Sequence, residues 1–264
     1  MINLDIKQKT IAKEVTLSGV GLHTGKSVTM TFKPAPENSG YSFVRSDLEG
    51  RPIIEADANY VVTTQRGTNL EKNGVNINTS EHVLAALVGL EIDNCIIELN
   101  ASEPPIMDGS SKYFIEILET AGFIEQEAFV EEYIVKEIIS YKDEKTGSEI
   151  MIIPSDKYEL TTMVDFGTNI LGTQNASITK ISEFKKEISD SRTFSFLHEI
   201  EMLLDHGLIK GGDLNNAIVY VDKELSPDIM DKLRVAFGKD DIAVKPNGIL
   251  NNLTLNHPNE AARH

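Results

Sequence analysis

The chain has 264 residues, of which 41% are hydrophobic, and this predicts a folded protein of two domains or one large domain. Its 41 acidic and 25 basic residues give a formal net charge of −16, which argues against nucleic-acid binding through clustered Lys and Arg. Cys95 is the single cysteine, which excludes an intrachain disulfide. The first residues lack a basic stretch followed by an apolar run, and no window approaches about 18 consecutive apolar residues. We therefore expect no signal peptide, no membrane span and a cytoplasmic location.

A short sequence pattern occurs twice along the chain. Ile11–Leu17 and Ile134–Ser140 share a Lys-Glu pair between apolar residues. Each is followed by a Thr-Gly turn, at Thr24-Gly25 and at Thr146-Gly147, and then by an apolar run closed by proline. The shared order favours an internal duplication, although two hairpins of similar composition also match by chance. We expect the two segments to occupy equivalent places in two similar domains.

The first half alternates between strand and helix patterns. Apolar and polar residues alternate around Val15 and Phe32, which is the period of a half-buried hairpin. Thr79 or Ser80 is the expected cap of a helix that Gly89 ends. The expected elements are a hairpin over 15–32, a helix over 80–90, a strand over 95–99 and a helix that follows Asp108-Gly109 and ends at Gly122.

The second half opens with the same strand patterns and then departs from the first. The acidic stretch 125–132 is the expected boundary, so we divide the chain into domains 1–126 and 127–264, the second with an insert near 195–250. Residues 259–264 read as the first turn of a helix. By the logic of the repeat, the sequence given ends inside the second domain and leaves an apolar face of the 133–165 sheet uncovered. The expected elements are strands near 133–141, 148–153, 158–165, 175–181 and 217–221, and helices from 182, near 197–206 and over 226–237. This order predicts an α+β fold of two similar domains.

Ser80-Glu81-His82 lies at the start of a predicted helix and is the first candidate for chemistry. An imidazole is a common zinc ligand, and an adjacent carboxylate can take a proton from zinc-bound water. Neighbouring helical residues point about 100° apart, so Glu81 and His82 border one cleft without sharing a helix face. The alternative is structural, because a Glu in a first helical turn also compensates the helix dipole.

His264 is a second candidate ligand, again in the first turn of a predicted helix. Two histidines from equivalent helices would meet at an interface between two similar domains. A hydrolytic zinc site usually has three protein ligands, and the residues alone indicate only these two. The alternative for His264 is an exposed terminal histidine.

Two glycine-containing segments have alternative interpretations. Gly19–Gly25 has the spacing GxGxxxG and joins two predicted strands, so it lacks the helix N-terminus that a phosphate-binding loop needs. A glycine-rich β-turn is expected there, with His23 free to line a cleft. Lys210-Gly211-Gly212 either lets a ligand approach the backbone or simply ends a helix.

Ser191-Arg192-Thr193-Phe194 ends a loop before a predicted helix. The Thr193 hydroxyl can donate to an oxyanion, and Phe194 can pack against a ligand. Equally, Thr193 can cap the helix and Phe194 can belong to the core. Cys95 lies in an apolar strand and is expected to be an inert core residue.

Taken together, these segments resemble the UDP-3-O-acyl-N-acetylglucosamine deacetylase family, the zinc amidases of bacterial lipid A synthesis. The motifs that carry the resemblance occur in order over nearly the whole chain. They are Gly-Val-Gly-Leu-His-Thr-Gly (19–25), Thr-Ser-Glu-His-Val-Leu-Ala-Ala-Leu (79–87), Pro-Ile-Met-Asp-Gly-Ser (105–110), Ser-Arg-Thr-Phe (191–194), Gly-Leu-Ile-Lys-Gly-Gly (207–212) and Glu-Ala-Ala-Arg-His (260–264).

The resemblance implies a fold, a cofactor and a reaction. The fold is two similar α+β layers with the active site between them, and the insert after Phe194 forms an apolar passage for the acyl chain. The cofactor is Zn²⁺, and the reaction hydrolyses the N-acetyl group of UDP-3-O-(3-hydroxyacyl)-N-acetylglucosamine and releases acetate. The implied site residues are Glu81 and Thr193 as catalytic groups, His82 and His264 as zinc ligands, and His23, Phe194, Lys210, Gly211 and Gly212 along the substrate.

The sequence departs from the family in two respects. An aspartate ligand four residues after His264, a lysine directly after it and a later acid histidine are absent, so weak zinc binding and poor turnover are expected. Residues 222–250 are longer than the usual insert. Some family members also carry a fused hydroxyacyl-carrier-protein dehydratase. The alternative functions are a non-catalytic sugar-nucleotide-binding or assembly module and a different zinc hydrolase.

Overall fold

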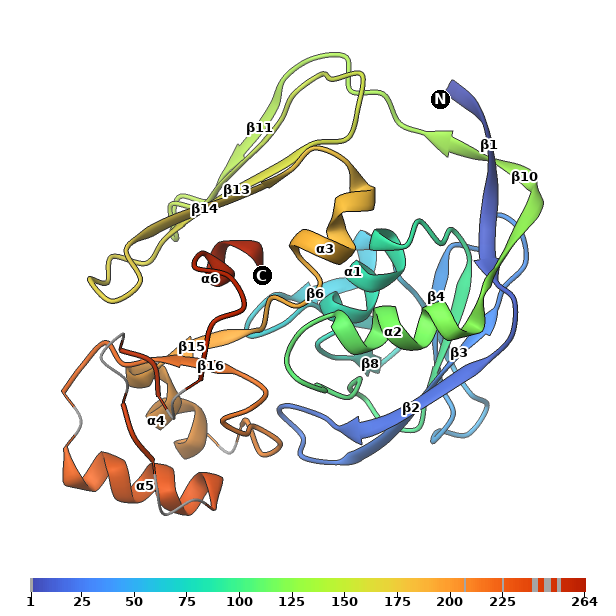
Figure 1. Ribbon diagram of the computed structural model, residues 1–264. Coiled ribbons are helices and arrows are strands. Elements are labelled where there is room, and N and C mark those ends of the chain that lie inside the picture. Colours follow the sequence, from blue (N-terminus) through green and yellow to red (C-terminus); the bar gives the residue numbers. More distant parts are fainter. Residues whose placement is uncertain (1, 207, 225, 239–241, 245–247, 251–252) are drawn as a thin grey trace.

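The computed structural model describes residues 2–206, 208–224, 226–238, 242–244, 248–250 and 253–264 (Figure 1). Both helices and strands occur along these ranges, with most of the strands in runs, in agreement with the predicted α+β class. The strands are β1 (Ile2–Ile11), β2 (Val15–Val20), β3 (Ser27–Pro34), β4 (Tyr41–Arg45), β5 (Ile53–Glu55), β6 (Val61–Thr63), β7 (Asn69–Lys72), β8 (Val75–Ile77), β9 (Cys95–Leu99), β10 (Phe123–Glu132), β11 (Ile139–Lys142), β12 (Glu149–Ile152), β13 (Leu160–Asp165), β14 (Thr173–Ile178), β15 (Phe194–Phe196) and β16 (Ile218–Tyr220). The helices are α1 (Glu81–Gly89), α2 (Lys112–Ala121), α3 (Phe184–Glu187), α4 (Leu197–Asp205), α5 (Pro227–Phe237) and α6 (Glu260–Arg263), with 3-10 turns η1 (Ala58–Tyr60) and η2 (Ile181–Glu183).

The first half is built on a mixed sheet with the strand order β2-β3-β9-β4-β5. The predicted hairpin forms β2 and β3, with Val15 opposite Phe32 and Leu17 opposite Met30. The predicted strand 95–99 is β9, which pairs antiparallel with β3 and parallel with β4. Met30 and Phe32 are fully buried, because the alternating pattern turns them toward the core.

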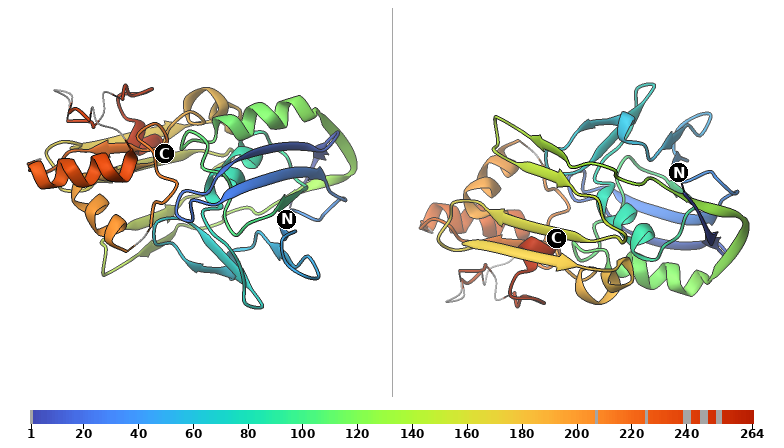
Figure 2. Two further views of the ribbon diagram at one scale, coloured as in Figure 1. Left: turned by 90° about the horizontal axis from the view of Figure 1, so that it is seen from below. Right: turned by 90° about the horizontal axis from the view of Figure 1, so that it is seen from above.

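Helices α1 and α2 pack on this sheet (Figures 1 and 2). Leu87 of α1 and Phe114 and Leu118 of α2 belong to the same buried cluster as Phe32. α1 ends at Gly89, and α2 is followed by Gly122. Gly122 has a φ of +67°, which glycine adopts easily because it has no Cβ. Both helices and both ends are as predicted.

Several strands of the first half were not expected from the sequence. The acidic stretch 125–132 lies within β10, which pairs antiparallel with β1 at the other end of the first half. Lys7 and Glu127 form an ion pair of 2.9 Å between these strands. Strands β4 to β8 are three to five residues long, too short for alternation to be recognised. These strands form because segments that are distant in the sequence pair with one another, and a local sequence pattern does not indicate them.

The second half contains two ribbons and a smaller unit with its own core. β11 pairs with β12 around the Thr146-Gly147 turn, as the repeated pattern predicts, and β13 pairs with β14. β15 and β16 are parallel, and α4 and α5 follow them in chain order. Leu197, Val219 and Leu233 belong to one buried cluster in this unit. The insert near 195–250 includes these residues and stays a prediction. Positions 239–241 and 245–247 of the insert lie outside the described residues.

The ribbons expose apolar side chains to solvent. Tyr141 is 67% exposed, Ile150 65% and Met163 74%. The expected uncovered apolar face in the 133–165 region is therefore present. Across the described ranges, helices of the length and apolar content that a membrane span requires are absent.

Candidate active site

Helix α1 starts directly after a sharp bend in the backbone. Thr79 has a φ of +53°, a conformation that β-branched residues rarely adopt. Two hydrogen bonds hold it, from its N–H to Asn69 Oδ1 (3.1 Å) and from its hydroxyl to Glu103 (3.1 Å). Ser80 occupies the cap position as predicted, but its hydroxyl donates to the Thr68 carbonyl (2.9 Å) and makes no cap bond. The start of α1 is thus fixed by contacts outside the helix.

Glu81 is the first residue of α1, and its carboxylate is held in place. The Thr68 N–H donates to Glu81 Oε2 at 2.8 Å. Burial raises the pKa of Glu81, while backbone hydrogen bonds and the nearby His264 and His23 oppose this shift. A carboxylate whose pKa is raised by burial is a better proton acceptor than an exposed one, as a general base requires.

The imidazoles of His82 and His264 lie side by side, with ring centroids 5.0 Å apart and planes at 67°. His82 is buried, and its Nδ1 atom has no hydrogen-bond partner. Although His264 is exposed as a whole residue, its ring lies against His82 and Phe194. Burial lowers the pKa of His82 and of His264 to about 4 in each case. Both rings are therefore neutral at pH 7, and a neutral imidazole has the nitrogen lone pair that a metal ligand needs.

Glu103 fastens the glycine-rich turn to the start of α1. Its buried carboxylate accepts from the backbone of His23 (3.0 Å), from the backbone of Thr24 (3.0 Å) and from the Thr79 hydroxyl (3.1 Å). His23 Nε2 lies 3.0 Å from the Arg66 carbonyl, and its Nδ1 is buried without a partner. Glu103 was not found from the sequence, because a lone acid before two prolines carries no periodic signal.

Thr193 is placed by backbone hydrogen bonds at the start of β15. Its N–H donates to the Gly109 carbonyl (2.7 Å), and its carbonyl accepts from Ile218 (2.8 Å). A Cβ at Gly109 would lie 2.0 Å from the Asn216 carbonyl, and the φ there is +85°. Glycine is therefore required where this turn of the first half meets β15 of the second.

Phe194 belongs to an aromatic cluster beside the histidines. Its ring centroid is 6.4 Å from that of His264, 5.5 Å from Phe166 and 5.8 Å from Tyr220, all with edge-to-face geometry. The cluster forms an apolar wall next to the paired imidazoles.

The two glycine-containing loops adjoin one another. Gly19 and Val20 end β2, and residues 21–26 form the turn to β3 that the sequence predicts, where the Gly25 N–H donates to the Gly21 carbonyl (2.9 Å). The Gly211 N–H donates to the Leu22 carbonyl (3.0 Å), and a Cβ at Gly211 would lie 2.2 Å from the Gly21 oxygen. Lys210 is exposed at this junction.

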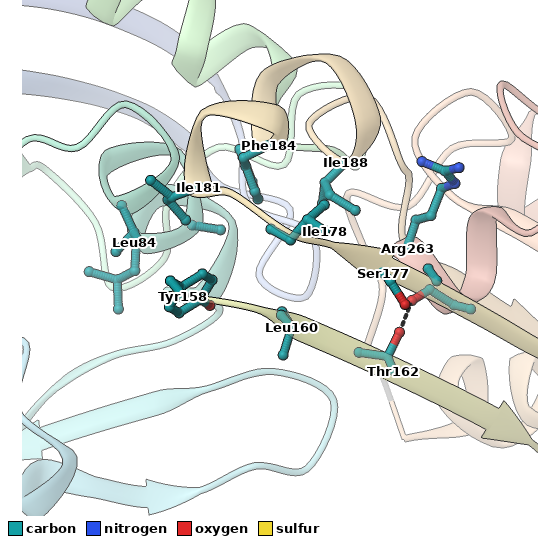
Figure 3. A pocket seen from close by; sticks show the side chains of 14 residues that line it. Leu84, Tyr158, Leu160, Thr162, Ser177, Ile178, Ile181, Phe184, Ile188 and Arg263 are labelled. Atoms are coloured by element: carbon teal, nitrogen blue, oxygen red, sulfur yellow. Dashed lines mark hydrogen bonds between the residues drawn. The ribbon is translucent and has the colours of Figure 1, made fainter. Parts of the chain in front are cut away.

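An apolar cavity of about 280 Å³ lies between α1, β13, β14, α3 and α6 (Figure 3). Leu84, Leu160, Ile178 and Phe184 line it, with Arg263 at one end. The side chains of Glu81, His82 and His264 are not among its lining residues. The cavity is therefore next to the paired histidines but is a separate space.

The structure brings several of the predicted site residues together. Glu81, His82 and His264 form one group, with Phe194 beside it. Lys210 and Gly211 contact the turn that carries His23, and His23 in turn lies near Glu81. Within the described part of the chain, no cluster of three or more His, Cys, Asp or Glu side chains has the geometry of a metal site.

The chain is similar to known deacetylases along nearly all of its length. Residues 8–237 match the family model described as LpxC, UDP-3-O-acyl N-acetylglycosamine deacetylase. A protein of Bacteroides thetaiotaomicron named bifunctional enzyme LpxC/FabZ is 46% identical over 98% of this chain and 56% of its own length. A protein of the same name from Chlorobaculum tepidum is 44% identical, with the same coverage.

A relative with a single function in its name is also similar. The UDP-3-O-acyl-N-acetylglucosamine deacetylase of Myxococcus xanthus is 41% identical over 84% of this chain and 70% of its own length. The chain spans about 56% of the length of the bifunctional relatives it matches. By the family model and these identities, the chain belongs to the UDP-3-O-acyl-N-acetylglucosamine deacetylase family.

Proposed function

We propose that the protein is a cytoplasmic, zinc-dependent deacetylase of lipid A biosynthesis. It hydrolyses the N-acetyl group of a UDP-3-O-(3-hydroxyacyl)-N-acetylglucosamine to acetate and a free amine. Family membership supports this proposal, as does the printed name of the Myxococcus xanthus relative. The observation that carries it is the paired imidazoles of His82 and His264, 5.0 Å apart, with Glu81 adjacent to one of them.

The two histidines fit a zinc site by their chemistry. His82 Nδ1 is buried without a hydrogen-bond partner, and neutral imidazole is a preferred zinc donor. His82 and His264 would hold the ion, with a further ligand needed to complete the usual three. When bound, zinc supplies Lewis acidity that makes a water molecule more acidic and the acetyl carbonyl more electrophilic.

The residues around the histidines have distinct roles in the proposed reaction. Glu81 accepts a proton from the attacking water, whose oxygen adds to the acetyl carbon. The Thr193 hydroxyl donates a hydrogen bond to the oxygen that gains negative charge. The C–N bond then breaks, the sugar nitrogen takes up a proton, and acetate leaves.

The neighbouring residues define where the substrate would lie. We assign the acyl chain to the apolar side, where Phe194 and its aromatic cluster stand next to His264. The remaining passage involves the insert near 195–250, part of which lies outside the described residues. His23 and the loop of Lys210, Gly211 and Gly212 would contact the sugar-nucleotide portion, since the two loops adjoin.

The proposal includes the architecture of the whole protein. Residues 1–126 and 127–264 would be two related domains, because the hairpins β2–β3 and β11–β12 share a sequence pattern, and because one histidine lies in α1 and the other directly after α6. The relatives named bifunctional support a second catalytic domain, a dehydratase, in the natural polypeptide. Sequencing the complete reading frame tests that part of the proposal.

Zinc content and acetate release, measured together on the complete polypeptide, test the reaction. Glu81→Gln is expected to retain zinc and to lose about 10²–10⁴-fold in rate, because it removes a proton acceptor. His82→Ala is expected to lose zinc as well as rate, because it removes a ligand. His206→Ala, which changes an exposed histidine on the turn after α4, is the matched control and should change neither.

Two outcomes would contradict the proposal. Equal zinc loss in Glu81→Gln and His82→Ala would make Glu81 a ligand or a structural residue. Binding of the UDP-sugar by the wild-type protein with neither zinc nor acetate release would instead indicate a non-catalytic binding module.

A further inference from the structure

A buried ion pair joins two segments that lie 68 residues apart in the chain. Arg192 and Glu260 are 8% and 0% exposed. Glu260 Oε1 accepts from the Arg192 N–H (3.0 Å) and from Arg192 Nε (2.8 Å). Glu260 Oε2 accepts from Arg192 Nη2 (3.1 Å) and from the Asn256 N–H (2.7 Å), and Nη2 also donates to the Thr254 carbonyl (2.8 Å). Both carboxylate oxygens are thus fully used.

Each partner of this pair adjoins a proposed site residue. Arg192 directly precedes Thr193, whose N–H is bound to Gly109. Glu260 opens α6, and its carbonyl accepts from the His264 N–H (3.0 Å), so His264 lies one helical turn after it. One ion pair therefore connects the backbone that carries Thr193 to the short helix that carries His264.

Further polar contacts near the ion pair join the same two segments of the chain. His257 Nε2 lies 2.9 Å from Asp190 Oδ1, and the Asn256 side chain donates to the Asp190 carbonyl (2.7 Å). Arg263 forms an ion pair of 3.1 Å with Glu187. Residues 254–263 are thus fastened along 187–192 by polar groups.

Stability alone does not account for the pair. A buried ion pair gains little over a well-packed apolar pair of the same volume, because both charges lose their hydration. An ion pair differs from an apolar pair in its directionality. The planar guanidinium and the carboxylate bind each other in one fixed geometry, so they fix the relative orientation of the segments that carry them. The contacts of Glu260 with Arg192 and of Arg263 with Glu187 therefore set the orientation of α6.

We infer that Arg192 and Glu260 are positioning residues that hold His264 and Thr193 in register with His82. This inference rests on the proposed function for the roles of those three residues. The pair does not contact the reacting atoms. It acts by fixing the orientation of α6 and of the start of β15, much as outer hydrogen bonds orient the ligands of other metal sites.

The test compares Arg192→Lys and Glu260→Gln with Arg45→Lys. Arg45 forms the same fork with Asp47, at 2.9 and 2.8 Å, and also donates to a carbonyl, that of Asn76. The control variant therefore loses a comparable buried arginine fork at the end of β4, at a residue outside the proposed site. The measurements are zinc affinity, kcat and KM for acetate release, thermal unfolding, and hydrogen–deuterium exchange of the metal-free protein.

The positioning role predicts a specific pattern. Arg192→Lys and Glu260→Gln lower zinc affinity and kcat by about 10–100-fold. KM changes little, and a higher concentration of free zinc restores part of kcat. Hydrogen–deuterium exchange becomes faster over residues 190–194 and 254–264. Arg45→Lys leaves zinc affinity and these exchange rates unchanged. If Glu260→Gln does not fold, Glu260→Asp makes the same test, because it keeps the charge and withdraws the carboxylate by one methylene.

The outcomes separate this inference from the proposed function. Wild-type protein that neither binds zinc nor releases acetate contradicts the proposed function, whatever the variants do. Unchanged exchange over 190–194 and 254–264 in both site variants overturns the positioning role. So does a loss of zinc affinity no larger than that of Arg45→Lys.

Discussion

Desolvation acts in opposite directions on the acidic and basic groups of the candidate site. It raises the pKa of the Glu81 carboxyl and lowers the pKa of the His82 and His264 imidazoles to about 4. In each case burial disfavours the charged form. Near neutral pH the candidate site therefore holds two neutral imidazoles beside the buried carboxyl group of Glu81.

The histidines make the stability of the metal-free protein depend on pH. The unfolded chain binds a proton on His82 below about pH 6.5, whereas the folded protein does so only near pH 4. The unfolded state holds more protons between these values, so the free energy of unfolding falls as the pH drops through this window. From pH 7 to pH 5 we expect a loss of about 2 kcal/mol from His82 alone.

Urea unfolding of EDTA-treated protein at pH 7 and pH 5 measures this loss. His82→Gln should reduce the difference between the two pH values, because glutamine does not titrate. His206→Gln, at an exposed position, should preserve the difference. An unchanged pH dependence in His82→Gln would show that other groups control it.

At the scale of elements, α1 makes a close contact with the second half of the chain. An added Cβ at Gly89 would lie 2.1 Å from Phe184 Cδ1. Phe184 opens α3, yet it is buried in the core cluster of the first half. Glycine at the end of α1 thus allows an aromatic residue of the second half to enter this core.

Gly89→Ala is therefore expected to destabilise the protein by about 1–3 kcal/mol, since the ring must shift to accept the methyl group. In a helix without such a contact, Gly→Ala would stabilise the protein by up to about 1 kcal/mol. A destabilising effect therefore indicates that the added methyl group meets the Phe184 ring. Chemical denaturation measures it. Val88→Ala, at an exposed neighbouring position, should change stability by less than about 0.5 kcal/mol.

A double variant completes this test. In Phe184→Ala the obstructing ring is removed, so the added change Gly89→Ala should no longer destabilise. Equal effects of Gly89→Ala with and without the ring would rule out the contact as the cause.

At the scale of the whole molecule, the ribbons β11–β12 and β13–β14 expose many apolar side chains. Ile139 and Ile150 are 53% and 65% exposed, and they lie on neighbouring strands. Exposed apolar side chains on neighbouring strands bind hydrophobic dyes and favour association between molecules.

Replacing exposed residues of the ribbons by Thr should reduce dye binding without loss of stability. Ile150→Thr with Met163→Thr keeps good strand formers and removes two side chains that are 65% and 74% exposed. Fluorescence of 8-anilinonaphthalene-1-sulfonate and thermal unfolding measure the two effects. Ile97→Thr, at a fully buried position of β9, should instead lower stability markedly. Dye binding equal to wild type in the double variant would place the exposed surface elsewhere.

Elements with a clear local period were predictable from the sequence. The hairpin β2–β3 and the helices α1, α2 and α5 follow from alternation, helical spacing and the glycines at their ends. Candidate residues next to such signals, Glu81 and His82 above all, were found in the same way. Their roles in zinc binding and catalysis stay predictions.

Contacts between distant segments were decided only by the tertiary structure. The pairing of β1 with β10, the strands β4 to β8 and the bond network of Glu103 have no local pattern. The sequence indicated two candidate histidines and a resemblance, but only the fold brings the rings of His82 and His264 to 5.0 Å from each other and Arg192 into a buried ion pair with Glu260. The physical reason is range: propensity and periodicity act within a few residues, whereas burial and ion pairing act between whichever segments the fold brings into contact.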